Sequence, residues 1–402
     1  MKTIPCPLCG SSKRRLVWYQ ESYPAFGGKV VPLEKAESIP WLPLEVSVCL
    51  DCYHIYESQV PEPELLKSFY TGVYTSSNPS PVMGGPLPKG LEAFFRMIQE
   101  AVGARRGRAL EIGAYDGYFL HLLEQDGWST TGFEPAEIGD IGKKTFNLNI
   151  RREFYQPGNS EESWDLVVSR YVFEHLPSPR EMLDGIFDEM ALGGWLALEV
   201  PDMQTRLREG ILGCFAHEHL SYFVPITLHG LVEETGFEVK HSVNSADGLS
   251  IVAQKPTRPS LRKKRIFSSE VQHLHQELID QFCKRRTQKR EKFTRELSSW
   301  SGPDNFVVYG ADSHTTDLLV ERWLPAEKVS WIIDDDPAKQ GCVAAGFSIP
   351  IVSRARLPEP GQALIVLSSF RNHDQMWENL LDWRSHGGAV MRFYPECLLM
   401  QP

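Results

Sequence analysis

Short apolar runs, separated by glycine and polar residues, dominate the middle of the chain. They predict buried strands at 109–112, 130–133, 164–169 and 249–253, and a turn followed by a further strand over 193–201. A helix is expected over 118–123, and a loop with the start of a helix over 170–175. This alternation predicts a doubly wound parallel sheet, which binds its ligand at the carboxyl ends of the strands.

The pattern changes after PTRP at 256–259, which interrupts the chain. Apolar residues at helical spacing predict one long helix over 268–297. Its lysines and arginines between 284 and 295 are interpreted as a solvated face, with a diphosphate-attracting surface or RNA binding as alternatives. Strands at 306–309, 329–333 and 363–368 predict a second, smaller α/β unit. Its turn at Gly310 lacks further glycines, so we expect it to be structural or to hold substrate rather than a second cofactor.

The length of 402 residues predicts two to four domains, and the net charge of -10 argues against bulk binding to nucleic acid. No apolar run approaches the roughly 18 residues that a membrane span requires. The N-terminus lacks the apolar core of a secretory signal. We therefore expect a cytoplasmic protein without a membrane partner.

Two CxxC pairs stand near the start of the chain, at Cys6, Cys9, Cys49 and Cys52. In a cytoplasmic protein such pairs are typical of metal ligands, and two of them complete a tetrahedral site for structural zinc. A redox CxxC is the alternative, but it would use one pair inside a βαβ unit. Zinc would stabilise a segment of about 60 residues that is too small to bury a good core.

The segment from Glu111 to Gly117 reads ExGxxxG at a predicted turn from strand to helix. This spacing is the one with which class I methyltransferases hold S-adenosylmethionine, whereas flavin and nicotinamide domains use another glycine pattern. Glu111 can attract the cationic amino end of that ligand, and Glu134, at the end of the next strand, can pair with ribose hydroxyls. The predicted cofactor-binding residues are Glu111, Gly113, Tyr115, Gly117, Glu134 and Ser169.

Two histidine-containing segments follow. Glu174 and His175 are expected to support the loop beside the cofactor. His217, Glu218 and His219 follow the strand that ends in EVPD, near the edge of the sheet where substrate should bind. In an extended chain His217 and His219 would face the same way, and histidine is suited to accept a proton near neutral pH. The alternatives are structural histidines, or a metal site that lacks a third ligand at helical spacing.

Together these motifs resemble the zinc-containing C-methyltransferases that act on nucleotide-activated keto-deoxysugars, typically at C3 of a 4-keto sugar. The matching segments span nearly the whole chain: CxxC at 6–9 and 49–52, ExGxxxG at 111–117, HEHxSYF at 217–223, VVYGA at 307–311 and DDDPAKQG at 334–341. The resemblance implies an α/β chain in four parts. These are a small N-terminal zinc-binding module (1–66), a central class I methyltransferase Rossmann-like domain (67–255), a linker and long helix (256–300), and a second Rossmann-like domain (301–402).

The resemblance also implies the chemistry. The acceptor is expected to be a small molecule, a nucleotide-linked keto-deoxysugar that is deprotonated beside its ketone and methylated on carbon. We expect His219 to be the base, His217 and Glu218 to orient it or the sugar, and Tyr74 and Tyr222 to donate near the carbonyl oxygen.

The chain departs from the family in two places. Ala216 stands where the family has tyrosine, and Asp312, Ser313 and His314 replace the usual residues of the C-terminal turn. Other small acceptors, methylated on carbon, oxygen or nitrogen, remain alternatives, as do RNA or protein substrates and a binding protein without activity. The sequence does not specify the sugar, its nucleotide or the methylated carbon.

Overall fold

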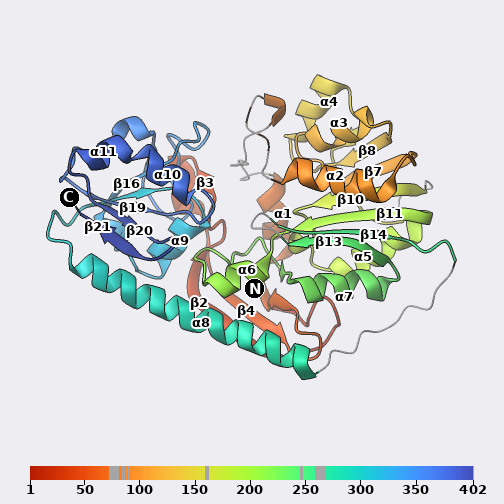
Figure 1. Cartoon of the computed structure of the whole chain (residues 1–402), viewed down its shortest axis with the longest axis horizontal. Helices are drawn as coiled ribbons and strands as arrows, with labels where there is room; N and C mark the ends of the chain where they lie inside the picture. The colour runs from red at the N-terminus through yellow and green to blue at the C-terminus, as the bar shows by residue number, and fades with distance from the viewer. Residues whose placement is uncertain are drawn as a thin grey trace.

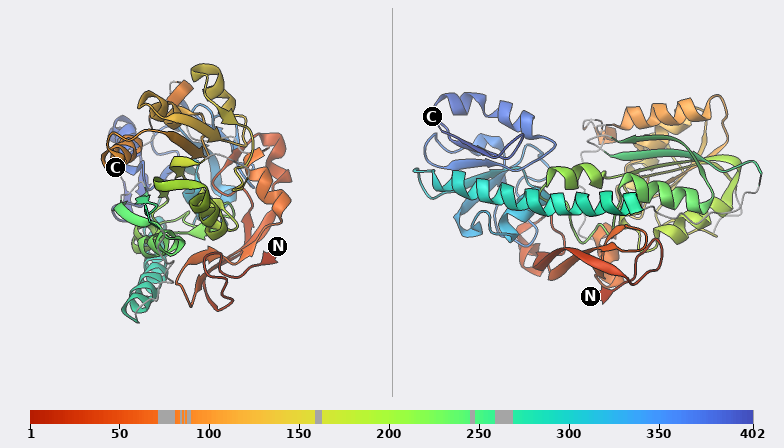
Figure 2. Two further views of the ribbon diagram at one scale, coloured as in Figure 1. Left: turned by 90° about the vertical axis from the view of Figure 1, so that its right-hand side faces the viewer. Right: turned by 60° about the horizontal axis from the view of Figure 1, so that its bottom comes forward.

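The computed structural model describes residues 1–71, 81–83, 85, 87, 90–158, 163–244, 248–258 and 269–401. Tyr74, a predicted hydrogen-bond donor, lies outside these residues. Two α/β lobes lie side by side, a long helix runs along both, and the N-terminal module packs against their junction (Figures 1 and 2). No helix in the described ranges combines the length and apolar character needed to cross a membrane.

The first lobe is built on a seven-stranded sheet in the order β13-β14-β11-β10-β7-β8-β9. The five strands from β11 to β9 are parallel, and β14 is antiparallel to both of its neighbours. The strands are β7 (Arg108–Ile112), β8 (Ser129–Phe133), β9 (Ile150–Arg151), β10 (Trp164–Arg170), β11 (Met190–Val200), β13 (Glu238–Asn244) and β14 (Leu249–Gln254). The helices are α2 (Leu91–Val102), α3 (Tyr118–Gln125), α4 (Gly139–Phe146), η3 (Phe173–His175), α5 (Pro179–Glu189), α6 (Met203–Glu209) and α7 (Pro225–Thr235).

The predicted doubly wound sheet is confirmed, with one difference at 193–201. There Gly193 and Gly194 lie inside β11 instead of forming a turn before it. The reason is a pairing partner distant in the sequence. Gly193 N–H donates to the Lys255 carbonyl at 3.0 Å, and Lys255 N–H donates to the Gly194 carbonyl at 2.8 Å, which extends the strand backwards.

The second lobe is built on a six-stranded sheet in the order β18-β16-β15-β19-β20-β21, in which only β21 is antiparallel. Its strands are β15 (Phe306–Tyr309), β16 (Val329–Ile333), β18 (Ile351–Val352), β19 (Leu364–Leu367), β20 (Val390–Arg392) and β21 (Leu398–Met400). Its helices are α9 (Ser313–Val320), η4 (Ala326–Lys328), η5 (Arg354–Arg356), α10 (His373–Asn379) and α11 (Leu381–Ser385).

The N-terminal module is joined to both lobes by strand pairing. Its sheet, β12-β5-β4-β2, takes β12 (Ser221–Tyr222) from the first lobe, and β3 (Val30–Val31) pairs with β17 (Val343–Ala344) of the second. The other elements are β1 (Lys2–Thr3), β2 (Arg14–Pro24), η1 (Leu33–Ser38), β4 (Trp41–Cys49), β5 (Ile55–Glu57), β6 (Gln59–Val60), α1 (Pro63–Thr71) and η2 (Pro81–Met83).

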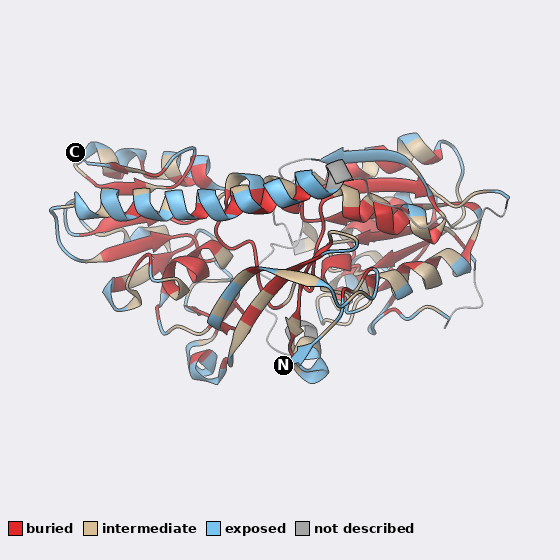
Figure 3. Cartoon of the chain, turned by 90° about the horizontal axis from the view of Figure 1, so that it is seen from below, coloured by how far each residue is buried: buried red, intermediate tan, exposed pale blue. Residues whose placement is uncertain are grey.

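Helix α8 (Ser269–Ser298) connects the lobes at its two ends. Leu278, Ile279 and Phe282 pack with the N-terminal module and α6, whereas Phe293 packs into the core of the second lobe. Its outer face is exposed (Figure 3). The helix therefore fixes how the two lobes face each other.

Candidate active site

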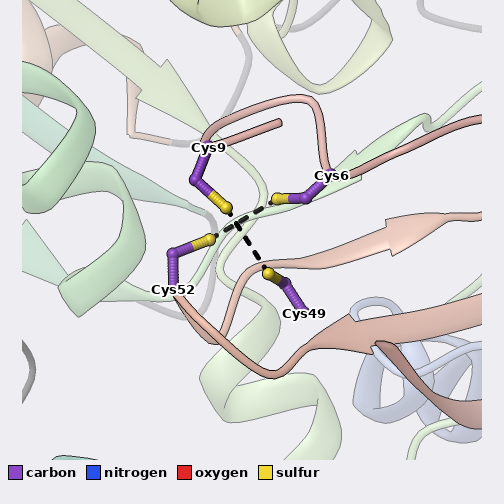
Figure 4. Close-up of side chains that lie close together, drawn as sticks. All are labelled: Cys6, Cys9, Cys49 and Cys52. Atoms are coloured by element: carbon purple, nitrogen blue, oxygen red, sulfur yellow. Dashed lines mark hydrogen bonds between the residues drawn. The ribbon is translucent and has the colours of Figure 1, made fainter. Parts of the chain in front are cut away.

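The four cysteines of the two CxxC pairs converge on one point, as the spacing predicted (Figure 4). The sulfur atoms of Cys6 and Cys52, and those of Cys9 and Cys49, lie 3.5 Å apart. Sulfur ligands about 2.3 Å from a tetrahedral zinc ion lie about 3.8 Å from one another. The thiols thus fit a zinc ion with little rearrangement, and Cys6 and Cys49 join the buried core of the first lobe.

Two predicted cofactor residues leave buried polar atoms without partners at the carboxyl edge of the first sheet. Glu111 Oε2 and Ser169 Oγ, on the neighbouring strands β7 and β10, have no hydrogen-bond partner among the described residues. Burial raises the pKa of Glu111 well above its usual value, opposed by the nearby Arg170 guanidinium. A buried polar atom without a partner costs about 1–3 kcal/mol, so this edge fits a ligand that supplies a cation and a donor.

The glycines of ExGxxxG have different surroundings. Gly113 has φ +77°, and a Cβ on it would come within 2.4 Å of the Val172 side chain. Gly117 has φ +81°, and a Cβ there would meet Leu148 at 2.8 Å and Gly142 Cα at 3.0 Å. Gly113 therefore lets the Val172 side chain pack against the turn, whereas Gly117 lets α3 pack closely on α4.

Glu134 directly follows β8, as expected, and its carboxylate organises the turn. Oε2 accepts from the Tyr115 N–H at 3.0 Å, and Oε1 accepts from the Ala136 N–H at 2.9 Å. Burial raises the pKa of Glu134, and these two backbone donors oppose the shift. Tyr115 itself adopts φ +49°. The carboxylate keeps further lone pairs that could accept from a ribose.

The HEH segment forms a turn and not the extended chain that was expected. His219 N–H donates to the Ala216 carbonyl at 3.0 Å, so the chain reverses at His217 and Glu218. As a result the two imidazoles diverge. His217 is fully buried with Nδ1 2.6 Å from Oε1 of Glu57, a residue of β5 that is also fully buried. Burial raises the pKa of Glu57 to about 7, and His217 opposes the shift.

His219 lies instead against the second predicted histidine segment. The rings of His219 and His175 have centroids 4.8 Å apart, and His175 Nδ1 is 2.7 Å from the Glu218 carbonyl oxygen. Burial, with His175 second, lowers the pKa of His219 to about 3, so the imidazole is neutral at physiological pH. Burial also raises the pKa of Glu174 to about 8. Metal-ligating atoms of Glu174, His175 and His219 lie within 4.8 Å of one another, whereas His217 is not in this group.

Glu218 forms an ion pair with a residue that the sequence analysis did not identify as part of the site. Its Oε2 lies 3.2 Å from the Lys29 ammonium of the N-terminal module. Burial alone would raise the pKa of Glu218, but Lys29 and the two neighbouring histidines lower it to about 2. The carboxylate is therefore ionised, and it ties the HEH turn to the module.

The predicted donor Tyr222 has its hydroxyl engaged inside the same loop. It lies 3.1 Å from both the N–H and the carbonyl oxygen of Ala216, and the side chain is 1% exposed. These two contacts hold residues 216–222 in a closed loop. The hydroxyl would have to leave Ala216 before it could donate to a substrate.

A buried network that sequence reasoning missed holds this loop from the second lobe. Asp317 on α9 accepts from the Gly213 N–H at 2.6 Å and from the Tyr23 hydroxyl at 3.0 Å. Arg286 of α8 donates to Asp317 at 3.0 Å and to Glu321. The acids are ordinary helix residues in sequence, so only the fold identifies them as a link between all three parts.

The cations of α8 are largely engaged with the protein. Lys289 donates to the Glu209 carbonyl at 2.7 Å, Arg290 to the Glu321 carbonyl at 3.0 Å, and Lys292 pairs with Glu396 at 2.7 Å. Arg286 is buried. The run of positive charge thus fastens α8 to its neighbours, which argues against the RNA-binding alternative.

The acid that follows the second strand of the C-terminal lobe, Asp334, already has protein partners that offset its charge. Asp334 follows β16 and accepts from the Ala311 and Asp336 N–H groups at 2.9 and 3.0 Å. Lys339 Nζ adds a hydrogen bond at 3.1 Å. At the turn, Asp312 caps α9 by accepting from the N–H groups of His314 and Thr315.

Comparison with known proteins agrees with this arrangement. Residues 89–242 match the family model of a methyltransferase domain, and residues 249–395 match that of a C-methyltransferase C-terminal domain. The C-methyltransferase NovU of Streptomyces niveus is 26% identical over 411 residues, covering 97% of this chain and 95% of that protein.

Two further relatives are more distant. An uncharacterized methyltransferase of Staphylococcus carnosus is 27% identical over 94 residues, or 23% of this chain and 45% of that protein. A solved structure, 1,6-didemethyltoxoflavin-N1-methyltransferase of Burkholderia thailandensis, is 15% identical with a TM-score of 0.39, covering 52% of this chain and 97% of that one. A likeness this weak carries no functional argument.

Proposed function

The chain is an S-adenosylmethionine-dependent methyltransferase with a C-methyltransferase C-terminal domain, and from this premise we propose that it methylates carbon beside the ketone of a nucleotide-linked keto-deoxysugar. The observation that carries the proposal is the meeting of His219 with His175 and Glu174 beyond the carboxyl end of β10. The same edge holds the unpartnered atoms of Glu111 and Ser169. Ionisable side chains therefore lie at the same edge as the predicted cofactor residues.

Bound S-adenosylmethionine would supply an electrophilic methyl group, and Glu111, Gly113, Tyr115, Gly117, Glu134 and Ser169 are proposed to hold it. His219 is proposed to take the proton beside the ketone at a ring nitrogen. Its neutral imidazole has a lone pair to do so, and the ionised Glu218, 3.9 Å from Nε2, favours the imidazolium that results. Tyr74 and Tyr222 are retained as proposed donors to the carbonyl oxygen, Tyr222 after release from Ala216.

Two arginines from different lobes support a diphosphate-bearing acceptor. Burial lowers the pKa of Arg206 on α6, and the Arg371 guanidinium of the second lobe lowers it further. The positive charge of Arg206 also lowers the pKa values of His219 and Glu174. This effect indicates that Arg206 lies in the neighbourhood of the proposed base. No carboxylate in the described part of the chain forms an ion pair with Arg206. These two cations, from different lobes, are proposed to bind the diphosphate of the acceptor.

Isotope exchange tests the proposal without requiring methyl transfer. Wild-type protein with a nucleotide-linked 4-keto-deoxysugar and S-adenosylhomocysteine should exchange the proton beside the ketone for solvent deuterium. His219→Ala should slow exchange about 10²–10⁴-fold and still bind S-adenosylhomocysteine. Exchange that survives in His219→Ala but is lost in His217→Ala would move the base to His217. Labelled methyl found on oxygen or nitrogen would reject the proposal.

We also propose that the four cysteines hold structural zinc and that the protein is cytoplasmic, where its thiols stay reduced. Metal analysis should find about one zinc per chain. Cys6→Ser should lower the yield of folded protein more than it changes the cofactor affinity of the part that folds. A metal-free protein with unchanged thermal stability would contradict the zinc assignment.

A further inference from the structure

The N-terminal module holds the HEH turn at two atoms of one residue, Glu57. Its backbone N–H donates to the Leu220 carbonyl at 3.1 Å, just before β12. Its side-chain Oε1 lies 2.6 Å from Nδ1 of His217, a residue 160 positions away in the sequence. Both side chains are 0% exposed. Their separation is that of a charge-assisted hydrogen bond shielded from solvent.

This contact constrains the chemistry of the imidazole. A carboxylate oxygen at Nδ1 keeps a proton between the two groups, so the second nitrogen, Nε2, is left for another contact. Nε2 is buried and has no partner among the described residues. The ring of Tyr23 packs against His217 with its centroid 6.1 Å away, which limits rotation of the imidazole. Geometry thus fixes which nitrogen faces Glu57.

The proposed zinc site is connected to the Glu57–His217 contact by one short strand. The ligand Cys52 precedes β5 (Ile55–Glu57), and β5 pairs with β12 through Tyr56–Ser221 and Ile55–Tyr222. One short strand therefore links a cysteine pair, the buried carboxylate and the segment that carries the proposed base. A module that only stabilised the fold would not need a buried carboxylate here, since a buried ionic pair can often be replaced by apolar side chains without loss of stability.

We propose that Glu57 is a positioning residue for methyl transfer: its contacts with His217 and with the Leu220 carbonyl hold the HEH turn, and with it the proposed base His219, in one orientation. The proposal deepens the function proposed above and rests on it. Glu57 acts through His217 and makes no contact with substrate itself. It gives the N-terminal module a role in the reaction besides metal binding.

Two single variants and a matched control test this role. Glu57→Gln keeps the shape but removes the charge, and Glu57→Leu removes the pair. Both should lower kcat, by about 10-fold and about 100-fold respectively, with unchanged affinity for S-adenosylhomocysteine. Glu45→Gln is the control, because Glu45 lies on the adjacent strand β4 and accepts from Ser58 and Gln59. It should keep kcat within about twofold.

The Glu57→Leu/His217→Leu double variant separates positioning from folding. Replacing both buried partners with apolar groups should restore thermal stability relative to either single variant. If Glu57 positions His217, the double variant stays as slow as the slower single variant. A double variant that recovers wild-type kcat, or a Glu57→Leu variant that never loses it, would overturn the proposal.

Nitrogen NMR of histidine-labelled protein tests the pairing without any acceptor. The resonances absent in His217→Asn assign the ring, and wild type should show a protonated Nδ1 that changes in Glu57→Gln but not in Glu45→Gln. This result supports the pairing even if no keto-sugar is turned over, so failure of the proposed function remains distinguishable. An unchanged His217 spectrum in Glu57→Gln would overturn it.

Discussion

The chain contains two mainly parallel sheets that end in similar turns, and the acids and other polar groups at these turns have different partners in the two sheets. In both, an acid after the second strand accepts from the backbone of the first turn: Glu134 from the Tyr115 N–H and Asp334 from the Ala311 N–H. In the second lobe Lys339 also neutralises the acid. In the first, Glu111 and Ser169 keep buried atoms that no described residue satisfies.

We interpret the first edge as the proposed binding edge and the second as a structural one. An unpartnered buried atom costs about 1–3 kcal/mol, and a ligand at the first edge would offset that cost for Glu111 and Ser169. The second edge is instead in contact with protein. A Cβ on Gly213 would come within 2.5 Å of the Ser313 and His314 backbone, and one on Gly28 within 2.9 Å of Ser313. The turn of the second lobe thus serves as a docking surface for the other two parts.

The largest effect should follow from filling the space at the first edge. Gly113→Val places a β-branched residue at φ +77° with its Cβ 2.4 Å from the Val172 side chain, so the turn and Val172 must shift at the predicted cofactor site, and calorimetry should detect no binding of S-adenosylhomocysteine. Gly310→Val is the matched change in the second lobe, where a Cβ would lie 2.5 Å from the Ser368 carbonyl oxygen. It should lower thermal stability instead. Normal cofactor binding by Gly113→Val would remove the contrast between the edges.

The next effect is electrostatic and depends on pH. Burial raises the pKa of Glu111 well above its usual value and so favours the protonated carboxyl in the free protein, whereas a cationic ligand favours the ionised form. Affinity for S-adenosylmethionine should therefore rise with pH, and binding should release a proton, measurable by calorimetry in buffers of different ionisation enthalpy. Glu111→Gln should weaken binding about 10- to 100-fold and abolish the proton release. Asp334→Asn, the matched change, should alter neither.

A smaller effect is expected where the second lobe faces the first. Arg371→Ala should raise KM for a nucleotide-diphosphate sugar about tenfold and leave the affinity for S-adenosylhomocysteine unchanged, because it removes one charge-assisted contact. Lys292→Ala removes a cation of α8 that pairs with Glu396, and it should change neither value. Equal loss of affinity for a sugar that lacks the diphosphate would argue against an anion site.

The features that could be predicted from the sequence are those that short segments of the chain determine, such as strands, turns and closely spaced motif residues. The strand before Gly113, the turn after it and the acid Glu134 lie within 30 residues, and apolar pattern with glycine spacing locates them. The convergence of the cysteines followed from the chemistry of two CxxC pairs.

The rest depends on contacts across the fold. Glu57 and Asp317 are ordinary carboxylates whose partners, His217 and Gly213, lie 160 and 104 residues away. The turn at HEH also escaped prediction, because Lys29 and Glu57 hold it from distant parts of the sequence, in addition to the local contact of Tyr222 with Ala216. An extended chain was the natural expectation without them.

The smallest effect concerns the cation that distinguishes the two acids. Lys339→Met removes the ammonium from Asp334 but leaves its two backbone donors, so stability should fall by about 1–2 kcal/mol. Thermal unfolding measures this loss, and activity at a temperature well below the transition should be unchanged. The carboxylate exposed by the change still faces a turn without further glycines and a capped helix, so the variant should not bind NAD or S-adenosylmethionine at a second site. A second equivalent of either ligand bound by Lys339→Met would show that this lysine alone suppresses a binding site, and that the two edges differ by one residue instead of by their packing.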